Sequence, residues 1–289
     1  MANSQVEHIT IQKISGGNIT SADDKVAVEE PLEIQLAYST ATGSMQKNIA
    51  VTMRTPGNDP ELAAGFLFTE GIIQNAAAIA QIKQLDENRV LLVLQENIMP
   101  VLANAARNFY STSSCGVCGK ASIDSIRTIS QYGEEKDGIC IPPSLLYPLQ
   151  DALKEQQKVF EDTGGIHASA LFDLDGKFIM LQEDVGRHNA LDKIIGKALL
   201  NGELPLNNCI LLLSGRASFE LVQKAVMAGI KIIAAVGAPS SLAVEMAKET
   251  GVTLIGFLKG DRFNIYSGGQ RVTSPQPLSK GDGQRPHRK

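Results

Sequence analysis

The chain has 289 residues, of which 43% are hydrophobic and 20% charged, with a formal net charge of -4 at pH 7. This length favours two domains, and the acidic balance argues against a general nucleic-acid-binding protein. No apolar run approaches the roughly 20 residues that cross a bilayer, and the first ten residues contain no secretion signal. We therefore expect a cytoplasmic protein without membrane or nucleic-acid partners.

The N-terminal part is expected to be rich in β-structure. The first fifty or so residues alternate Ile, Val and Thr with polar breaks, which predicts short antiparallel strands, several with one solvated face. A helix follows, because Asp59 can cap it, Pro60 suits its first position and Gly71 can end it. Residues 88–95 then predict another strand.

The middle of the chain changes from loop to regular structure. Residues 100–120 have a loop composition of Ser, Thr, Gly and Asn, and a short helix is expected near 123–129. An amphipathic helix should end at Gly164, and residues 166–186 predict a β-hairpin. The helix that follows carries apolar residues at helical spacing, namely Ala190, Leu191, Ile194, Ile195, Ala198 and Leu199.

From Cys209 onward the pattern becomes regular. We expect strands at 209–213, 231–236 and 252–257, with helices at about 217–228 and 239–249. Near-continuous apolar strands that alternate with helices indicate βαβ units and a parallel sheet covered on both faces. The sequence thus predicts a β-rich domain over residues 1–130, whose last part is a mobile loop at about 108–121. An α/β domain over 131–266 follows, and then a disordered basic tail over 267–289.

The three strands of the second domain end in segments that suit an anionic ligand. In open α/β sheets ligands bind outside the carboxyl ends of the strands. Gly215 and Gly237 allow close backbone approach, while Arg216, Lys259 and Arg262 can neutralise phosphates. Glycines at strand ends also simply make turns, but together the three segments favour a nucleotide or pyrophosphate. They are 214–218, 237–241 and 257–262.

A second polar group lies where a strand gives way to a helix. Asp184, Arg187, His188 and Asn189 cluster there, and His188 can act as an acid, a base or a hydrogen-bond donor to phosphate. The alternative is that Asp184 or Asn189 only caps the helix and His188 is a surface residue. His167 opens the preceding strand and reads as a structural histidine slightly more readily than as a catalytic one.

Two of the four cysteines form a CxxC pair, Cys115 and Cys118. A structural zinc site needs four ligands, but Cys140 and Cys209 are single and the histidines are not paired in sequence, so we expect no metal. A redox pair fits CxxC better. The loop setting best fits a thiolate that carries sulfur as a persulfide, with Lys120 nearby to stabilise it.

Five segments together closely resemble the FdhD family, the sulfur carriers required for formate dehydrogenase activity. The similarity runs from about residue 25 to 266, through SSCGVCGKASID, GGIHASALFD, EDVGRHNALDKIIG, LSGRASFELVQKA and GAPSSLAVEMAKETGVTLIGFLKGDRFNIYS. The resemblance implies a cytidine-deaminase-like three-layer α/β core beside a smaller β-rich α+β domain. It also implies a cytoplasmic homodimer that takes sulfur from a cysteine desulfurase. The acceptor would be the molybdenum cofactor, as bis-molybdopterin guanine dinucleotide, before insertion into formate dehydrogenase.

The same resemblance assigns roles to individual residues. Cys115 would form the persulfide and Cys118 would be its partner. The cofactor, or a guanine nucleotide such as GDP as its partial mimic, would bind at Phe257, Leu258, Lys259, Gly260, Asp261 and Arg262, with Arg216 and His188 nearby. Zinc deamination is not expected, because neither His167 nor His188 has a glutamate two residues later. A thiol–disulfide oxidoreductase and a cofactor chaperone with incidental cysteines are the alternatives.

Overall fold

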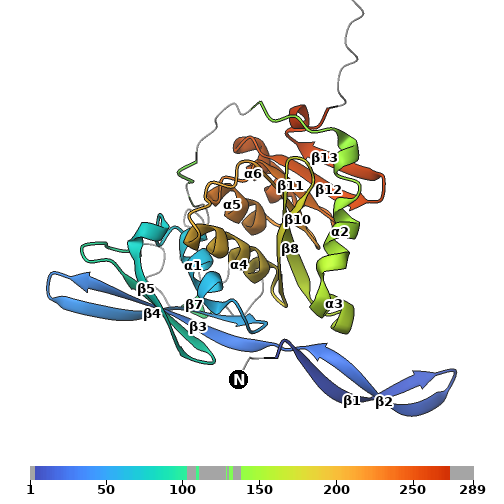
Figure 1. Ribbon diagram of the computed structural model, residues 1–289, viewed down its shortest axis with the longest axis horizontal. Helices are drawn as coiled ribbons and strands as arrows, with labels where there is room; N and C mark the ends of the chain where they lie inside the picture. The colour runs from blue at the N-terminus through green and yellow to red at the C-terminus, as the bar shows by residue number, and fades with distance from the viewer. Residues whose placement is uncertain (1–3, 103–108, 111–127, 129, 133–137, 274–289) are drawn as a thin grey trace, which may run out of the picture.

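The chain begins with a projecting hairpin. The computed structural model describes residues 4–102, 109–110, 128, 130–132 and 138–273. Strands β1 (Val6–Ser15) and β2 (Asn18–Ala27) pair antiparallel and stand away from the rest of the molecule (Figure 1). Gly16 and Gly17 between them have φ values of 56° and 85°, the left-handed conformation that a tight two-residue hairpin turn requires.

A five-stranded sheet makes up most of the remaining N-terminal part. Its order is β5-β6-β3-β4-β7, with β3 (Glu30–Thr40), β4 (Gly43–Arg54), β5 (Ile79–Asp86), β6 (Arg89–Leu94) and β7 (Phe109–Tyr110). The expected antiparallel pairing holds for β3 with β4 and for β5 with β6, but β3 runs parallel to β6. Helix α1 (Asp59–Thr69) lies between β4 and β5 in the chain and covers one face of the sheet. Because it carries the chain across the sheet, β5 and β6 join on the far side of β3, and β6 lies parallel to β3.

The second sheet has six strands in the order β13-β12-β11-β10-β8-β9. Their bounds are β8 (His167–Asp173), β9 (Phe178–Asp184), β10 (Cys209–Leu213), β11 (Ile232–Ala235), β12 (Thr253–Lys259) and β13 (Arg262–Ser267). Only β10, β11 and β12 are parallel, as predicted for that region, whereas β8, β9 and β13 run antiparallel to their neighbours. Tight hairpins join β8 to β9 and β12 to β13, and a short turn permits only antiparallel pairing. The sheet is therefore mixed.

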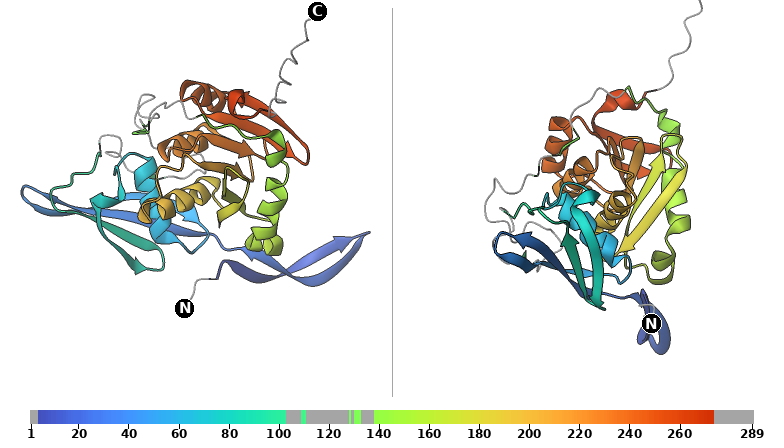
Figure 2. Two further views of the ribbon diagram at one scale, coloured as in Figure 1. Left: turned by 45° about the horizontal axis from the view of Figure 1, so that its top comes forward. Right: turned by 60° about the vertical axis from the view of Figure 1, so that its left-hand side comes forward.

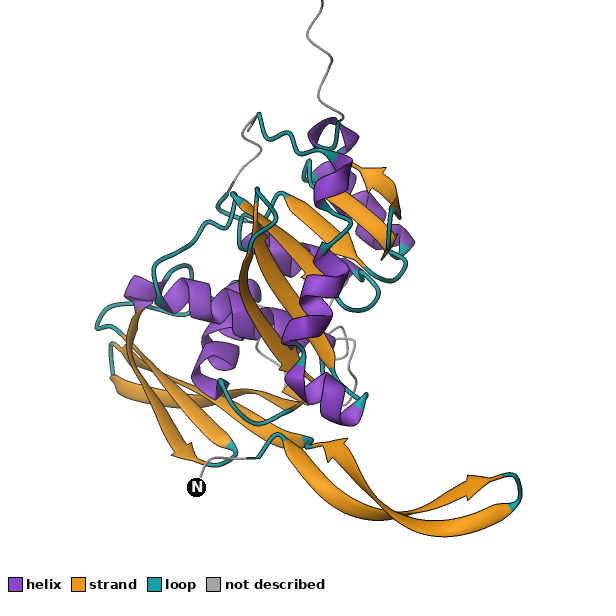
Figure 3. Ribbon diagram, turned by 45° about the vertical axis from the view of Figure 1, so that its right-hand side comes forward, coloured by secondary structure: helices purple, strands orange, loops and turns teal. Residues whose placement is uncertain are grey.

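Helices cover both faces of this sheet (Figures 2 and 3). One face packs on α4 (Arg187–Leu200), α5 (Phe219–Met227) and α6 (Ser241–Glu249), and the other on α2 (Leu149–Gln156). The single helix predicted to end at Gly164 is two helices, because the chain bends at Gln157 before α3 (Lys158–Thr163). Gly164, with φ of 66°, ends α3 as predicted. Short 3-10 turns lie at Ala76–Ala78, Pro143–Leu145 and Gly269–Arg271.

The main hydrophobic core runs across the predicted domain boundary at residue 130. It joins α1 and the five-stranded sheet to α4, α5 and α6. Helices α1 and α4 touch backbone to backbone, since a Cβ built on Gly65 would lie 1.9 Å from the Asp192 carbonyl oxygen, and one on Gly196 would lie 1.8 Å from that of Glu61. The mixed α/β class is as expected, and the boundary itself stays a prediction.

The predicted disordered tail is wrong for residues 267–273. Arg271 is buried and its Nη1 donates to the Gly251 carbonyl oxygen at 2.7 Å, while Val272 bridges to Ile141. Residues 274–289 and most of the predicted loop at 108–121 lie outside the described residues, as does nearly all of the helix expected near 123–129. Within the described part of the chain, none of the helices has the length and apolarity to cross a membrane.

Candidate functional site

The loops after β10, β11 and β12 meet at one edge of the six-stranded sheet, as predicted. The Gly237 amide donates to the Gly215 carbonyl oxygen at 2.9 Å, and the Phe257 amide donates to the Gly237 carbonyl oxygen at 3.2 Å. Helices α4, α5 and α6 also begin here. Strand β8 begins here because it runs antiparallel to β10. Hereafter this region is the carboxyl edge.

The glycine of the second loop is explained by packing between loops. A Cβ on Gly237 would lie 2.9 Å from the Arg216 amide nitrogen and 3.0 Å from its Cα. One on Gly256 would lie 2.8 Å from Cδ of Pro239. Contacts this short cannot be relieved without moving backbone, so these glycines let neighbouring loops pack closely whether or not a ligand binds.

Four basic side chains at the carboxyl edge have no carboxylate partner in the part of the chain that the structure describes. Arg216, Lys259 and Arg262 are exposed, Arg187 at the start of α4 is partly exposed, and none forms an ion pair with any residue that the structure describes. In a chain of net charge -4, unpaired cations together with helix N-termini favour an anion at this place. Arg187 also keeps a buried Nε without a hydrogen-bond partner.

The segment Phe257–Arg262 is a hairpin rather than a loop that leads into a helix. Strand β12 bulges at Phe257 and continues to Lys259, which pairs with Arg262 across the turn at Gly260. Phe257 has φ of 55° and is 48% exposed, an uncommon conformation for an aromatic residue and one that accompanies functional sites. The Leu258 side chain is buried in the core, so only its backbone can face a ligand. Asp261 is exposed on the turn.

His188 is bound to the start of α5 rather than free on the surface. Its Nε2 lies 3.0 Å from Oε2 of Glu220 and 3.2 Å from Oγ of Ser218. The His188 and Glu220 side chains are only 12% and 13% exposed. Glu220 was missed by the sequence reasoning, since an acidic residue in a first helical turn is common for its effect on the helix dipole alone. Its place two residues after the first edge loop was the one available signal.

Asp184 and Asn189 have structural roles at the start of α4, which favours the structural interpretation for these two residues of the motif. Asp184 Oδ1 accepts hydrogen bonds from the Gly186 amide at 2.8 Å and from Asn189 Nδ2 at 3.1 Å, while Oδ2 lies 2.7 Å from Nζ of Lys193. Asn189 Nδ2 also donates to the Met53 carbonyl oxygen at 2.7 Å. These contacts hold the start of α4 against β4 of the other sheet. Burial raises the pKa of Asp184, and Lys193 opposes that rise.

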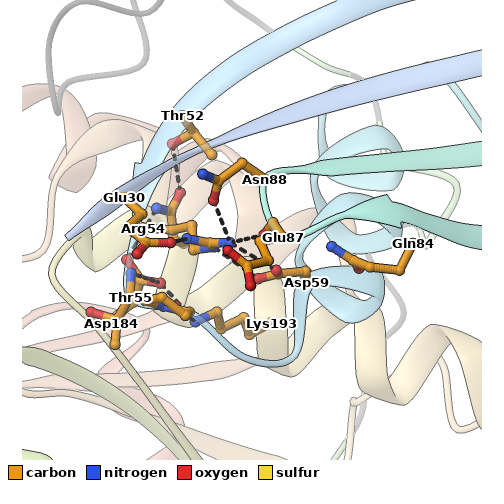
Figure 4. A network of polar contacts seen from close by, with 12 residues as sticks. Glu30, Thr52, Arg54, Thr55, Asp59, Gln84, Glu87, Asn88, Asp184 and Lys193 are labelled. Carbon is orange, nitrogen blue, oxygen red and sulfur yellow. Dashed lines mark hydrogen bonds and ion pairs between the residues drawn. The ribbon is translucent and has the colours of Figure 1, made fainter. Parts of the chain in front are cut away.

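The network continues into the N-terminal part (Figure 4). Thr55 donates its amide to Asp184 Oδ2 at 3.2 Å and accepts from Lys193 Nζ at 2.8 Å. Arg54, fully buried, makes two hydrogen bonds to the Asp59 carboxylate at 2.9 and 3.0 Å. Asp59, which the sequence suggested as a helix cap, therefore neutralises an arginine instead, and the residue at the cap position is Asn58.

His167 lies at the carboxyl edge with the unpaired cations. It is partly buried, and a Cβ on Gly215 would contact its ring at 3.4 Å from Nδ1. Burial, and then the nearby Arg187 and His188, lower the pKa of His167 below its ordinary value. The structure thus places His167, His188 and Arg187 together at the edge that also carries Arg216.

The predicted sulfur-carrying pair, Cys115 and Cys118, lies outside the described residues, as does Lys120. Of the other two cysteines, Cys140 is exposed and Cys209 is half-buried on β10, where burial raises its pKa. Within the described residues no group of three or more His, Cys, Asp or Glu could hold a metal ion.

The chain that follows the CxxC pair returns to helix α5. At Thr128 the amide donates to Gln223 Oε1 at 3.3 Å, and Gln223 Nε2 donates to Thr128 Oγ1 at 3.2 Å. Ser130 Oγ then donates to the Val226 carbonyl oxygen at 2.9 Å. Helix α5 therefore carries Glu220 at the carboxyl edge and, further along, the return point of the cysteine segment.

The described residues form a mixed α/β protein with a two-stranded hairpin, two larger sheets that share a core, and a cation-lined edge at the carboxyl ends of three parallel strands. The model of the FdhD/NarQ family matches residues 27–273, and the chain belongs to this family. The resemblance stated from the sequence is thereby confirmed, and the projecting hairpin lies almost entirely before the matched residues.

Relatives in distant organisms cover nearly the whole chain. It is 45% identical over 285 residues to a sulfur carrier protein FdhD of Streptomyces coelicolor, which covers 95% of this chain and 98% of the relative. It is 41% identical over 268 residues to the sulfur carrier protein FdhD of Sulfurisphaera tokodaii, with 93% and 99% covered. The crystal structure of a putative formate dehydrogenase accessory protein from Desulfotalea psychrophila superposes with a TM-score of 0.72 at 25% identity, over 93% of this chain and 100% of that one.

Proposed function

We propose that this protein carries sulfur to the molybdenum cofactor, in its bis-molybdopterin guanine dinucleotide form, before the cofactor enters formate dehydrogenase. Relatives named as sulfur carriers and a structural relative titled a formate dehydrogenase accessory protein support the role. The observation that carries the cofactor part is the group of unpaired cations beside exposed Phe257 at the carboxyl edge. A cytidine-deaminase-like core and a cytoplasmic homodimer belong to the same proposal.

Sulfur would be accepted on Cys115 from a cysteine desulfurase. The Cys115 thiolate attacks the outer sulfur of the desulfurase persulfide, so that a new S–S bond forms on Cys115. The S–S bond in the desulfurase breaks, and its cysteine leaves as a thiolate, without net oxidation. Cys118 would assist the transfer as the neighbouring thiol.

The cofactor would dock as a substrate at the carboxyl edge. Its guanine base can stack on Phe257, an exposed aromatic ring in a fixed unusual conformation. Its pyrophosphate groups would be neutralised by Arg216, Lys259 and Arg262, and backbone amides at the starts of the helices would donate to the remaining oxygens. The Gly260–Asp261 turn would hold Lys259 and Arg262 on neighbouring strands.

The sulfur-carrying step is tested by intact-protein mass spectrometry after incubation with a cysteine desulfurase and cysteine. We expect a gain of one sulfur mass that a thiol reductant reverses and that Cys115→Ala abolishes. Cys140→Ala is the matched control, because Cys140 is exposed yet outside the CxxC pair, and it should keep the adduct. An adduct that survives in Cys115→Ala would contradict the persulfide and favour the cofactor chaperone. If no sulfur adduct forms, and if activity is lost equally in Cys115→Ala and Cys118→Ala, the thiol–disulfide oxidoreductase would be favoured.

The cofactor edge is tested by GDP binding, measured by calorimetry. Arg216→Met should weaken GDP about 10- to 100-fold, because a hydrogen bond to a charged group is worth about 1.5–3 kcal/mol. Lys13→Met is the control: Lys13 is also exposed but lies on the projecting hairpin, and its loss should leave the affinity unchanged. Equal affinities for wild type and Arg216→Met would place the nucleotide elsewhere.

A further inference from the structure

His167 occupies a fixed position at the carboxyl edge. It is the first residue of β8, and the next residue locks this strand to the end of β10 through two hydrogen bonds. The Ala168 amide donates to Ser214 Oγ at 2.8 Å, and the Ser214 amide donates to the Ala168 carbonyl oxygen at 3.0 Å. The imidazole ring is therefore held against Gly215 in the first edge loop.

The imidazole of His167 is an unused titratable group. Neither ring nitrogen makes a hydrogen bond with any residue in the described ranges, although the side chain is half-buried. Its ring nitrogens are not among the buried atoms that lack a partner in the described ranges, so they reach solvent and are accessible to a ligand oxygen.

Among the described residues, two arginines near His167 lack an ion-pair partner, whereas the other charged groups around it lie in close pairs. Asp184 on β9 is neutralised by Lys193 at 2.7 Å, and His188 on α4 is paired with Glu220 on α5 at 3.0 Å. Arg187 on α4 and Arg216 in the loop after β10 have no ion-pair partner among the described residues. Burial, then Arg187 and His188, lower the pKa of His167, so its ring is neutral at pH 7.

We propose that His167 is the proton acceptor of the carboxyl edge: a pyrophosphate group that binds beside Arg187 and Arg216 is bound together with one proton on the His167 ring. The proposal rests on the proposed function, in which this edge receives the pyrophosphates of the cofactor. The proton comes from solvent and adds to a ring-nitrogen lone pair, and the N–H so formed donates to a phosphate oxygen. No covalent bond of the ligand changes.

The physical reason is linkage between anion and proton. Negative charge beside the ring stabilises the imidazolium, so the pKa of His167 is higher in the complex than in the free protein. Between these two pKa values affinity rises as pH falls, by up to about tenfold per pH unit, and it levels off below the free-protein pKa. The carboxyl edge would then bind pyrophosphate with an additional positive charge on His167 that the free protein does not carry at neutral pH.

Calorimetry measures the proton directly. Inorganic pyrophosphate is titrated into the full-length protein at neutral pH, in buffers of different ionisation enthalpy, and the slope of the binding heat against that enthalpy counts protons taken up. Pyrophosphate itself binds protons, so the measured quantity is the difference between wild type and His167→Gln. We expect wild type to take up more protons than His167→Gln, with an excess of up to one proton per bound pyrophosphate.

Two further histidine variants make the assignment specific. His8→Gln, on the projecting hairpin, should keep the wild-type uptake, and His188→Gln tests the other histidine of the carboxyl edge. If uptake is lost in His188→Gln and kept in His167→Gln, the proton acceptor is His188 and the proposal is overturned.

The remaining outcomes separate this inference from the proposed function. Binding of pyrophosphate with equal proton uptake in wild type and His167→Gln overturns the inference alone. Absence of binding to wild type by both pyrophosphate and GDP overturns the anion edge and the inference together. As a check that does not depend on the variant's folding, the NMR titration of the His167 ring in wild type should shift to higher pH when pyrophosphate is added. An unchanged titration contradicts the proposal.

Discussion

Two sets of basic side chains in this protein differ in whether they form an ion pair with a carboxylate. Arg54, Lys193 and Lys224 are buried, and each lies within 3 Å of an aspartate oxygen. Arg187 and Arg216, at the carboxyl edge, have none within the described part of the chain. Lys193 and Arg187 belong to the same helix. Pairing, rather than charge or position in sequence, therefore separates side chains that hold the fold from those available to a ligand.

The largest effect is expected when a paired cation is removed. Lys193→Met leaves Asp184 buried without its counter-ion, and breaking a buried pair in this way costs about 3–5 kcal/mol of unfolding free energy. Urea denaturation measures the loss. Arg216→Met is the control from the unpaired set and should stay within about 0.5 kcal/mol of wild type. Similar losses in the two variants would mean that the two sets do not differ in the way described.

A smaller loss of stability is expected when the close contact between α1 and α4 is disturbed. Helix α4 carries Lys193 of the paired set, and this contact holds the helix in place. Gly196→Ala places a Cβ 1.8 Å from the Glu61 carbonyl oxygen, and overpacking of this kind costs about 1–3 kcal/mol or more. Gly165→Ala is the control, because its backbone is not left-handed and the nearest atom to the new Cβ is 3.8 Å away. A stable Gly196→Ala protein would show that the two helices can separate without disturbing the core.

The regular part of the fold was accessible from sequence because its signals are local. Near-continuous apolar runs at 209–213 and 252–257 identified parallel strands, and the polar residues after them identified one edge. Strand β13 was missed because it follows β12 through a two-residue turn, and the edge segment 257–262 was read as a loop. The break at Gln157 was missed because no Pro or Gly lies between Leu149 and Thr163 to mark it.

The polar networks were not accessible, because their members are far apart in the chain. Thr55 and Asp184 are 129 residues apart, and no spacing rule connects them. The same holds for His188 and Glu220, which meet only because α4 and α5 begin at the same edge. The sequence therefore suggested correct residue types at the edge but could not show which were already paired, and so could not separate Asp184 from Arg187.

The smallest effect is expected from His167, which belongs to neither set. Its pKa is lowered in the folded protein, whereas in the unfolded chain it returns to its ordinary value of 6.5. The unfolded state therefore binds more protons between these two pKa values, and stability present above pH 6.5 falls as pH falls toward the folded pKa. Urea denaturation across this range should show a slightly shallower loss in His167→Gln than in wild type or in the hairpin control His8→Gln. Saturating pyrophosphate should reverse the wild-type trend, because the bound anion would raise the pKa of His167. Identical pH profiles with and without His167 would mean that folding does not change the titration of this imidazole. His167 would then not be a group kept available for a ligand.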